Sequence, residues 1–144
     1  MSKHKFMEFF LPMIPPTITT QQHKVTVENG KPRFYDPPKL ANAKVKLKAH
    51  LAKYTPKAPY DVAVRLYTKW LFPISGKHFD GEYKPTKPDT DNLQKMLKDC
   101  MTDCKFWKDD AIVASEVVEK FYAELPGIYI GIEVLENEQE RNCG

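Results

Sequence analysis

Two short acidic clusters and one lysine are the residues of this sequence best suited to chemistry. Asp89 and Asp91 precede a helical stretch, Asp109 and Asp110 follow it, and Lys95 lies inside its first turns. Mg²⁺ prefers oxygen ligands and is commonly held by a few carboxylates together with water and substrate phosphate. The alternative is that one aspartate caps the helix and the others are solvated. One helix needs only one N-cap, and Asp-x-Asp offers two, which favours a divalent-metal site over any single aspartate taken alone. On spacing alone, a metal site and a set of solvated aspartates both stay open, and so does the substrate.

The segment between the clusters has the pattern of one amphipathic helix. Its apolar residues recur at helical spacing and are Leu93, Met96, Leu97, Cys100, Met101 and Cys104. Pro88 disfavours helical geometry in the residue before it, so the helix should start after Pro88. We expect Asp91 to be the N-cap, with Gln94 reaching back in a capping box.

The length of this helix sets a condition on the metal site. About 14 helical residues rise roughly 21 Å. Asp109 and Asp110 can therefore meet Asp89 and Asp91 only if the following loop turns back, and Trp107 is our candidate for its anchor.

Two sequence motifs connect these residues to a known family. Lys-Pro-Asp-Thr-Asp-Asn-Leu-x-Lys, at residues 87–95, and Phe-Trp-Lys-Asp-Asp-Ala-x-Val, at 106–113, closely resemble the RusA family of Holliday junction resolvases. The resemblance is strongest over about residues 84–122. The compact basic run that this family often carries in its N-terminal half is only approximated here, by residues 21–24 and 30–34.

The resemblance implies roles for individual residues. Asp89, Asp91 and Asp110 fall on the family's metal-binding catalytic aspartates, Asp109 matches the adjacent acidic residue, and Lys95 matches the catalytic lysine. It further implies Mg²⁺ as cofactor, with Mn²⁺ as a substitute, a homodimer with a RusA-like fold, and four-way junction DNA as substrate.

The charge distribution agrees with a polyanionic partner. Residues 1–109 hold 20 Lys and Arg against 11 Asp and Glu, whereas residues 110–144 hold 2 against 8. Phosphate contacts supply much of the affinity for nucleic acid, although a basic surface can also be merely solvated. The residues that we expect to contact DNA are Lys24, Lys31, Arg33, Lys39, Lys46, Lys53, Arg65, Lys69, Lys84 and Lys87.

Hydrophobic periodicity predicts an α+β, two-layer domain, with two helices packed on a mixed β-sheet. The expected strands are Phe6–Leu11, Tyr60–Leu71, Ala111–Tyr122 and residues 128–134, with Val62 among the core-facing residues of the second. Asn29-Gly30 indicates a hairpin, and Asp36-Pro37 the start of a helix over residues 38–54. The loop 72–86 leads into the site. We expect one domain over residues 1–136 and an acidic tail over 137–144.

The whole sequence bounds the function. No run approaches the roughly 18 apolar residues of a membrane span, and three cysteines argue against a disulfide framework, so we expect a cytoplasmic protein. The favoured function is Mg²⁺-dependent nicking of four-way DNA junctions. A metal-dependent nuclease for flaps or other branched DNA, and a non-catalytic DNA-binding protein, are the alternatives.

Overall fold

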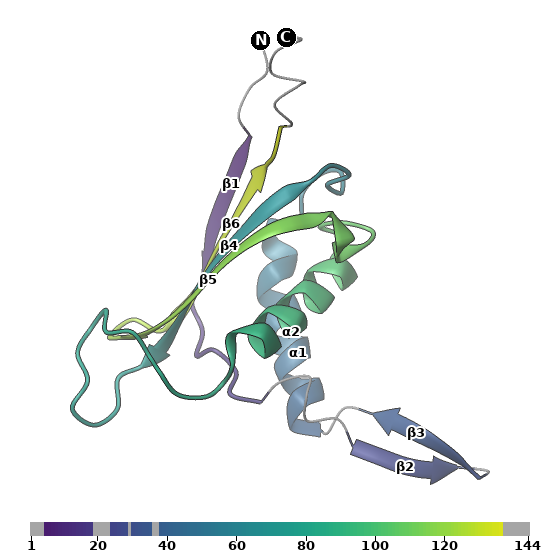
Figure 1. The fold of residues 1–144 in the computed structure, drawn as a ribbon, viewed down its shortest axis with the longest axis horizontal. Helices are drawn as coiled ribbons and strands as arrows, with labels where there is room; N and C mark the ends of the chain where they lie inside the picture. Colours follow the sequence, from purple (N-terminus) through teal and green to yellow (C-terminus); the bar gives the residue numbers. More distant parts are fainter. Residues whose placement is uncertain (1–4, 19–23, 29, 36–37, 137–144) are drawn as a thin grey trace.

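The computed structural model describes residues 5–18, 24–28, 30–35 and 38–136, and its centre is a four-stranded mixed sheet in the order β1-β6-β4-β5 (Figure 1). The strands are β1 (Phe6–Leu11), β4 (Val64–Pro73), β5 (Val113–Ala123) and β6 (Gly127–Val134). β6 pairs antiparallel with both β1 and β4, while β4 and β5 are parallel. The predicted α+β class, with two helices on a mixed sheet, is confirmed.

β4 is the strand on which the core is built. Its side chains alternate between the two faces of the sheet, and Val64, Leu66, Trp70 and Phe72 are buried on the helix-covered side. The predicted strand began at Tyr60, which is wrong by four residues. The Tyr60 amide donates instead to the Phe106 carbonyl at 2.7 Å, so this stretch leaves the sheet and Val62 is 46% exposed.

Two helices cover one face of the sheet. In Figure 1, α1 (Pro38–Leu51) and α2 (Thr90–Asp103) cross each other on the same side of the four strands. A 3-10 turn, η2 (Ala52–Tyr54), continues α1 to the predicted end of this helix. Leu40, Leu47 and Leu51 of α1 are fully buried, as are Leu93, Met96, Leu97 and Met101 of α2. The predicted apolar stripe of α2 is thus the face that closes the core.

The direction of α2 follows from the parallel pairing of β4 and β5. A crossover between parallel strands must carry the chain back to the end at which both strands begin. α2 therefore begins near the C-terminal ends of β4 and β5 and ends near the start of β5, where the short 3-10 turn η3 (Asp110–Ile112) lies. The two acidic clusters are thus placed at different ends of one helix.

A separate hairpin extends away from this body (Figure 1). β2 (Lys24–Glu28) and β3 (Lys31–Tyr35) pair antiparallel with each other, as Asn29-Gly30 predicts, and form a two-stranded sheet of their own. Pro32 can sit in such a sheet because every strand in it is an edge. The predicted cap at Asp36-Pro37 and the acidic tail 137–144 lie outside the described residues.

Gly127 provides a test of the packing between β6 and β1. A Cβ atom there would overlap the ring of Phe10 and lie 2.7 Å from the Leu11 carbonyl oxygen, which belongs to the main chain and cannot rotate away. Gly127→Ala should therefore lower the free energy of unfolding by about 1–3 kcal/mol in urea denaturation. Gly131→Ala is the control: its closest neighbours are the ends of the Phe6 and Tyr129 side chains, which can move. An equal loss in both variants would contradict this packing.

Candidate active site

The first acidic cluster lies at the N-terminal end of α2, with both carboxylates exposed. Asp89 is the N-cap residue, in an extended conformation, and its carbonyl oxygen accepts a hydrogen bond from the Leu93 amide at 3.1 Å. The prediction that Asp91 caps the helix is wrong, because the helix begins at Thr90 and Asp91 lies in its first turn. The Asp89 side chain makes no capping hydrogen bond either. Neither carboxylate is used to cap the helix. The negative charge of each is stabilised by the partial positive charge at the N-terminal end of α2.

Gln94 has a different role from the predicted capping box. Its side chain is 2% exposed, and its Oε1 accepts hydrogen bonds from Thr68 Oγ1 at 2.8 Å and from Trp70 Nε1 at 3.2 Å. These contacts tie the first turns of α2 to the central strand β4. Asp91 and Lys95, on the same turns of α2, are both exposed.

The segment before Asp89 runs along the outer edge of β5. Main-chain hydrogen bonds join Gly81 and Glu82 to Tyr122, and the Lys84 amide to the Lys120 carbonyl oxygen at 3.0 Å. The predicted loop 72–86 is therefore held along the edge strand over residues 81–84. The Lys120 ammonium contacts the same segment farther on, at the carbonyl oxygens of Thr86 and Pro88.

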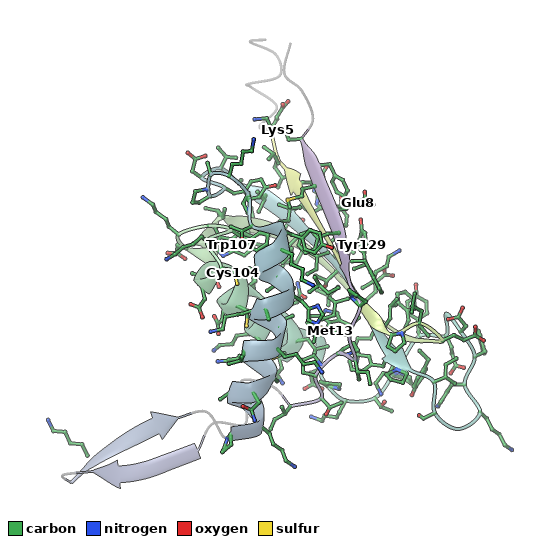
Figure 2. The ribbon with its side chains drawn as sticks, turned by 180° about the vertical axis from the view of Figure 1, so that it is seen from behind. Lys5, Glu8, Met13, Cys104, Trp107 and Tyr129 are labelled. Carbon is green, nitrogen blue, oxygen red and sulfur yellow. The ribbon has the colours of Figure 1, made fainter. Side chains whose placement is uncertain are left out.

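The second acidic cluster lies at the other end of α2. Asp109 accepts a hydrogen bond from the Ala111 amide at 2.9 Å and so caps η3. A hollow of about 450 Å³ adjoins it, lined by Lys44, Asp99, Thr102, Asp103, Lys108, Asp109 and Asp110. Trp107, labelled in Figure 2, does anchor the return of the chain, since it is 1% exposed and its Nε1 donates to Thr102 Oγ1 at 2.8 Å.

The return loop does not unite the two clusters within one chain. Asp110 reaches the part of α2 near Asp99, which is two turns, or roughly 12 Å, beyond Asp91 along the helix. Lys95 lies between them, four residues from each. Among the residues that the structure describes, no group of three or more His, Cys, Asp and Glu side chains is placed to hold a metal ion. Asp89 and Asp91 supply two oxygen donors, which suit Mg²⁺ when water and substrate phosphate complete its shell.

The residues expected to contact DNA differ in what they already bind. Lys39 and Lys46 of α1 and Lys53 of η2 are exposed, and so are Lys31 and Lys69 elsewhere. Arg65 is ion-paired with Glu133 at 2.8 Å and donates to Ser115 Oγ, so its guanidinium is already bound to neighbouring side chains.

Two of the expected DNA contacts belong to the segment before Asp89. Lys84 donates to Thr86 and lies over the rings of Phe72 and Tyr122. Lys87 is exposed, and its ammonium lies 3.5 Å from an Asp89 carboxylate oxygen. The side chains of Lys24 and Arg33 lie outside the described set.

Sequence reasoning missed Lys120 and the anchoring role of Gln94. Lys120 has the local pattern of an ordinary strand lysine, and only the parallel register, which sets it opposite Trp70, brings it beside residues 86–88. Gln94 had a detectable signal, because it lies next to the apolar stripe, on the side of α2 that faces the sheet.

The sequence was compared with known proteins. Residues 14–133 match the family described as endodeoxyribonuclease RusA. A crossover junction endodeoxyribonuclease rusA from Lactococcus phage r1t is 36% identical over 107 residues, covering 72% of this chain and 78% of the relative. An uncharacterized protein of Bacillus subtilis (strain 168), YqaN, is 30% identical over 118 residues, covering 74% and 82% respectively. In the described part of the chain, no helix has the length and apolar character to cross a membrane.

The position of Asp110 can be tested through Asp99. Burial raises the pKa of the Asp99 carboxyl; Lys44 lowers it, and the negative charge of Asp110 raises it further. Asp110→Asn should therefore lower the pKa of Asp99, measured by the carboxyl carbon shift in an NMR titration without metal. Asp89→Asn is the control and should leave the pKa of Asp99 unchanged, because Asp89 is at the opposite end of α2. A shift caused by Asp89→Asn instead would contradict this placement.

Proposed function

The chain belongs to the RusA endodeoxyribonuclease family, and on that premise we propose that it resolves four-way DNA junctions by Mg²⁺-dependent hydrolysis. The observation that carries this proposal is the exposed start of α2. There, the Asp89 side chain makes no capping hydrogen bond and Asp91 lies inside the first turn, so both carboxylates are exposed one or two turns from Lys95, beside a segment rich in lysine. An N-cap aspartate with a purely structural role commonly accepts a hydrogen bond from the helix through its side chain, and the Asp89 side chain does not.

In this proposal Asp89, Asp91 and Asp110 hold the metal, and Asp109 shapes the turn that carries Asp110. When bound, Mg²⁺ would supply an activated water and stabilise charge on the scissile phosphate. Lys95 is exposed on the outer side of α2 and would bind a phosphate oxygen or stabilise the leaving oxygen. Lys87, next to Asp89, would help to bring the phosphate to the carboxylates.

We further propose that the functional unit is a homodimer. A four-way junction has two-fold symmetry, and resolution needs two nicks at symmetric positions. A C₂ dimer supplies two equivalent sites with the same symmetry. Because the two acidic clusters are separated within one chain, each metal site can be completed in one of two ways. Asp110 joins Asp89 and Asp91 of its own chain after a shift of residues 104–110, or it joins those of the second chain.

The carboxylates are tested one at a time. Asp89→Asn, Asp91→Asn and Asp110→Asn each remove a hard anionic ligand while nearly preserving shape, so each should lower junction cleavage by at least about 100-fold. Junction affinity, measured in Ca²⁺ by gel shift, should stay equal or improve, because less negative charge meets the DNA. Asp80→Asn is the control, since the Asp80 carboxylate accepts a hydrogen bond from the Glu124 amide at 2.9 Å and is not among the proposed ligands. If one of these variants cuts at the wild-type rate, the residue substituted in it is not a ligand of the metal.

Mixing two inactive variants decides how a site is assembled. In a heterodimer of Asp91→Asn and Asp110→Asn chains, sites built within one chain would both be broken, and no nick would form. Sites shared between chains would leave one site intact, and a supercoiled cruciform plasmid would become a nicked circle.

Cleavage of a synthetic junction, a flap and a linear duplex by the wild-type protein separates a junction resolvase from a nuclease of broader substrate range. Absence of metal-dependent cleavage on all three would leave only a DNA-binding role.

The basic side of α1 is tested through salt dependence. Lys39, Lys46 and Lys53 are exposed at seven-residue spacing, and each phosphate contact contributes about 0.9 to the slope of log K against log salt. Changing all three to Gln should weaken junction binding and reduce that slope by up to about 2.7. Lys48→Gln is the control, because Lys48 points to α2 and pairs with Asp103 at 3.4 Å. An unchanged slope in the triple variant would show that these three lysines contact solvent and not DNA.

A further inference from the structure

Lys120 of β5 is bonded to the segment that delivers Asp89 to the site. Its ammonium donates to the carbonyl oxygens of Thr86, at 2.5 Å, and of Pro88, at 2.7 Å. Its own main-chain carbonyl oxygen accepts from the Lys84 amide at 3.0 Å. One residue of the sheet therefore holds three alternate residues of the segment, and the last of them, Pro88, directly precedes Asp89.

We propose that Lys120 is a positioning residue for the metal-binding carboxylates, which fixes residues 84–88 on the edge of the sheet and thereby sets the place of Asp89. This inference rests on the proposed function of Asp89 and Asp91. It assigns Lys120 no contact with the substrate or the metal. Its effect is transmitted through the main chain of residues 86–88.

The energetics of Lys120 argue against an incidental surface lysine. The side chain is partly buried, and burial, together with repulsion from Lys84 and Lys87, lowers the pKa of its ammonium, whereas attraction to Asp89 raises it. Its two partners are neutral carbonyl groups, which offset less of the desolvation cost than a carboxylate would. An aliphatic side chain would avoid that cost at the same place on the strand. What the lysine adds is two directed hydrogen bonds to the main chain at the start of α2.

Other contacts hold the first part of the segment but stop short of Asp89. Tyr83 Oη donates to Glu119 at 3.1 Å, and its ring packs on Phe121 at 4.7 Å between centroids. Main-chain bonds to Tyr122 secure Gly81 and Glu82. Beyond residue 84 in the described structure, the hydrogen bonds that join the segment to β5 are those of the Lys120 ammonium. Without them, residues 85–88 would connect a fixed turn to α2 with no hydrogen bond to β5 among those that the structure shows.

The experiment compares Lys120→Met, which keeps length and apolar volume without donors, with Lys120→Arg, which keeps the donors and the charge. Lys77→Met is the matched control, because Lys77 is an exposed lysine of the same loop and its loss removes the same charge. Hydrogen exchange by mass spectrometry reports on residues 84–89 without DNA or metal. Junction cleavage is titrated with Mg²⁺ to obtain the half-saturating concentration, and thermal melts check folding; Lys120→Gln replaces Lys120→Met if the latter is unfolded at the assay temperature.

We expect Lys120→Met to speed exchange in residues 84–89 and to raise the half-saturating Mg²⁺ concentration by about tenfold. Lys120→Arg should restore most of both properties, and Lys77→Met should behave as wild type. Wild-type exchange in Lys120→Met would overturn the positioning role, and so would faster exchange with an unchanged Mg²⁺ titration. A wild-type protein that cuts no junction at any metal concentration would instead overturn the proposed function, while the exchange result would still decide whether Lys120 holds the segment.

Discussion

The parallel pairing of β4 with β5 is the constraint on which the rest of this structure depends. Two adjacent parallel strands need a crossover, and here the crossover is α2 together with the segments on either side of it. The helix must run opposite to both strands, which separates its N-terminal aspartates from Asp110 at the start of β5. The same pairing places Lys120 near the C-terminal end of β5, next to the start of α2. Fold and site thus share one topological cause.

The start of α2 combines rigid support with exposed carboxylates. On its inner side, Gln94 accepts hydrogen bonds from two residues of β4, which holds the helix against the sheet. On its outer side, Asp89 and Asp91 are exposed, and the Asp89 side chain is not used for capping. A side-chain cap commonly contributes about 1 kcal/mol to a helix. Omitting it keeps both carboxylates available to a cation, which is the arrangement that the proposed function needs.

The outer edge of the sheet, formed by β5, is partly covered by the segment that leads to α2. An exposed edge strand presents unpaired main-chain groups and invites pairing with other chains. Here residues 81–84 cover part of the β5 edge through main-chain hydrogen bonds to Lys120 and Tyr122. The segment that protects this edge is also the one that leads to Asp89, so edge protection and site position are coupled in the same few residues.

The sequence by itself determined most of the elements and the family, because both are carried by local patterns. The apolar period of residues 93–104, the alternation in β4 and Asn29-Gly30 each specify an element from neighbours along the chain, and the structure confirms all three. The acidic motifs likewise indicated the family, and the comparisons confirmed it. Only the tertiary structure decided which residue caps α2, since the packing of Gln94 on Thr68 and Trp70 sets where the helix lies. It also decided that Asp110 lies beside Asp99 and away from Asp91, because strand direction is a long-range property that no local pattern encodes.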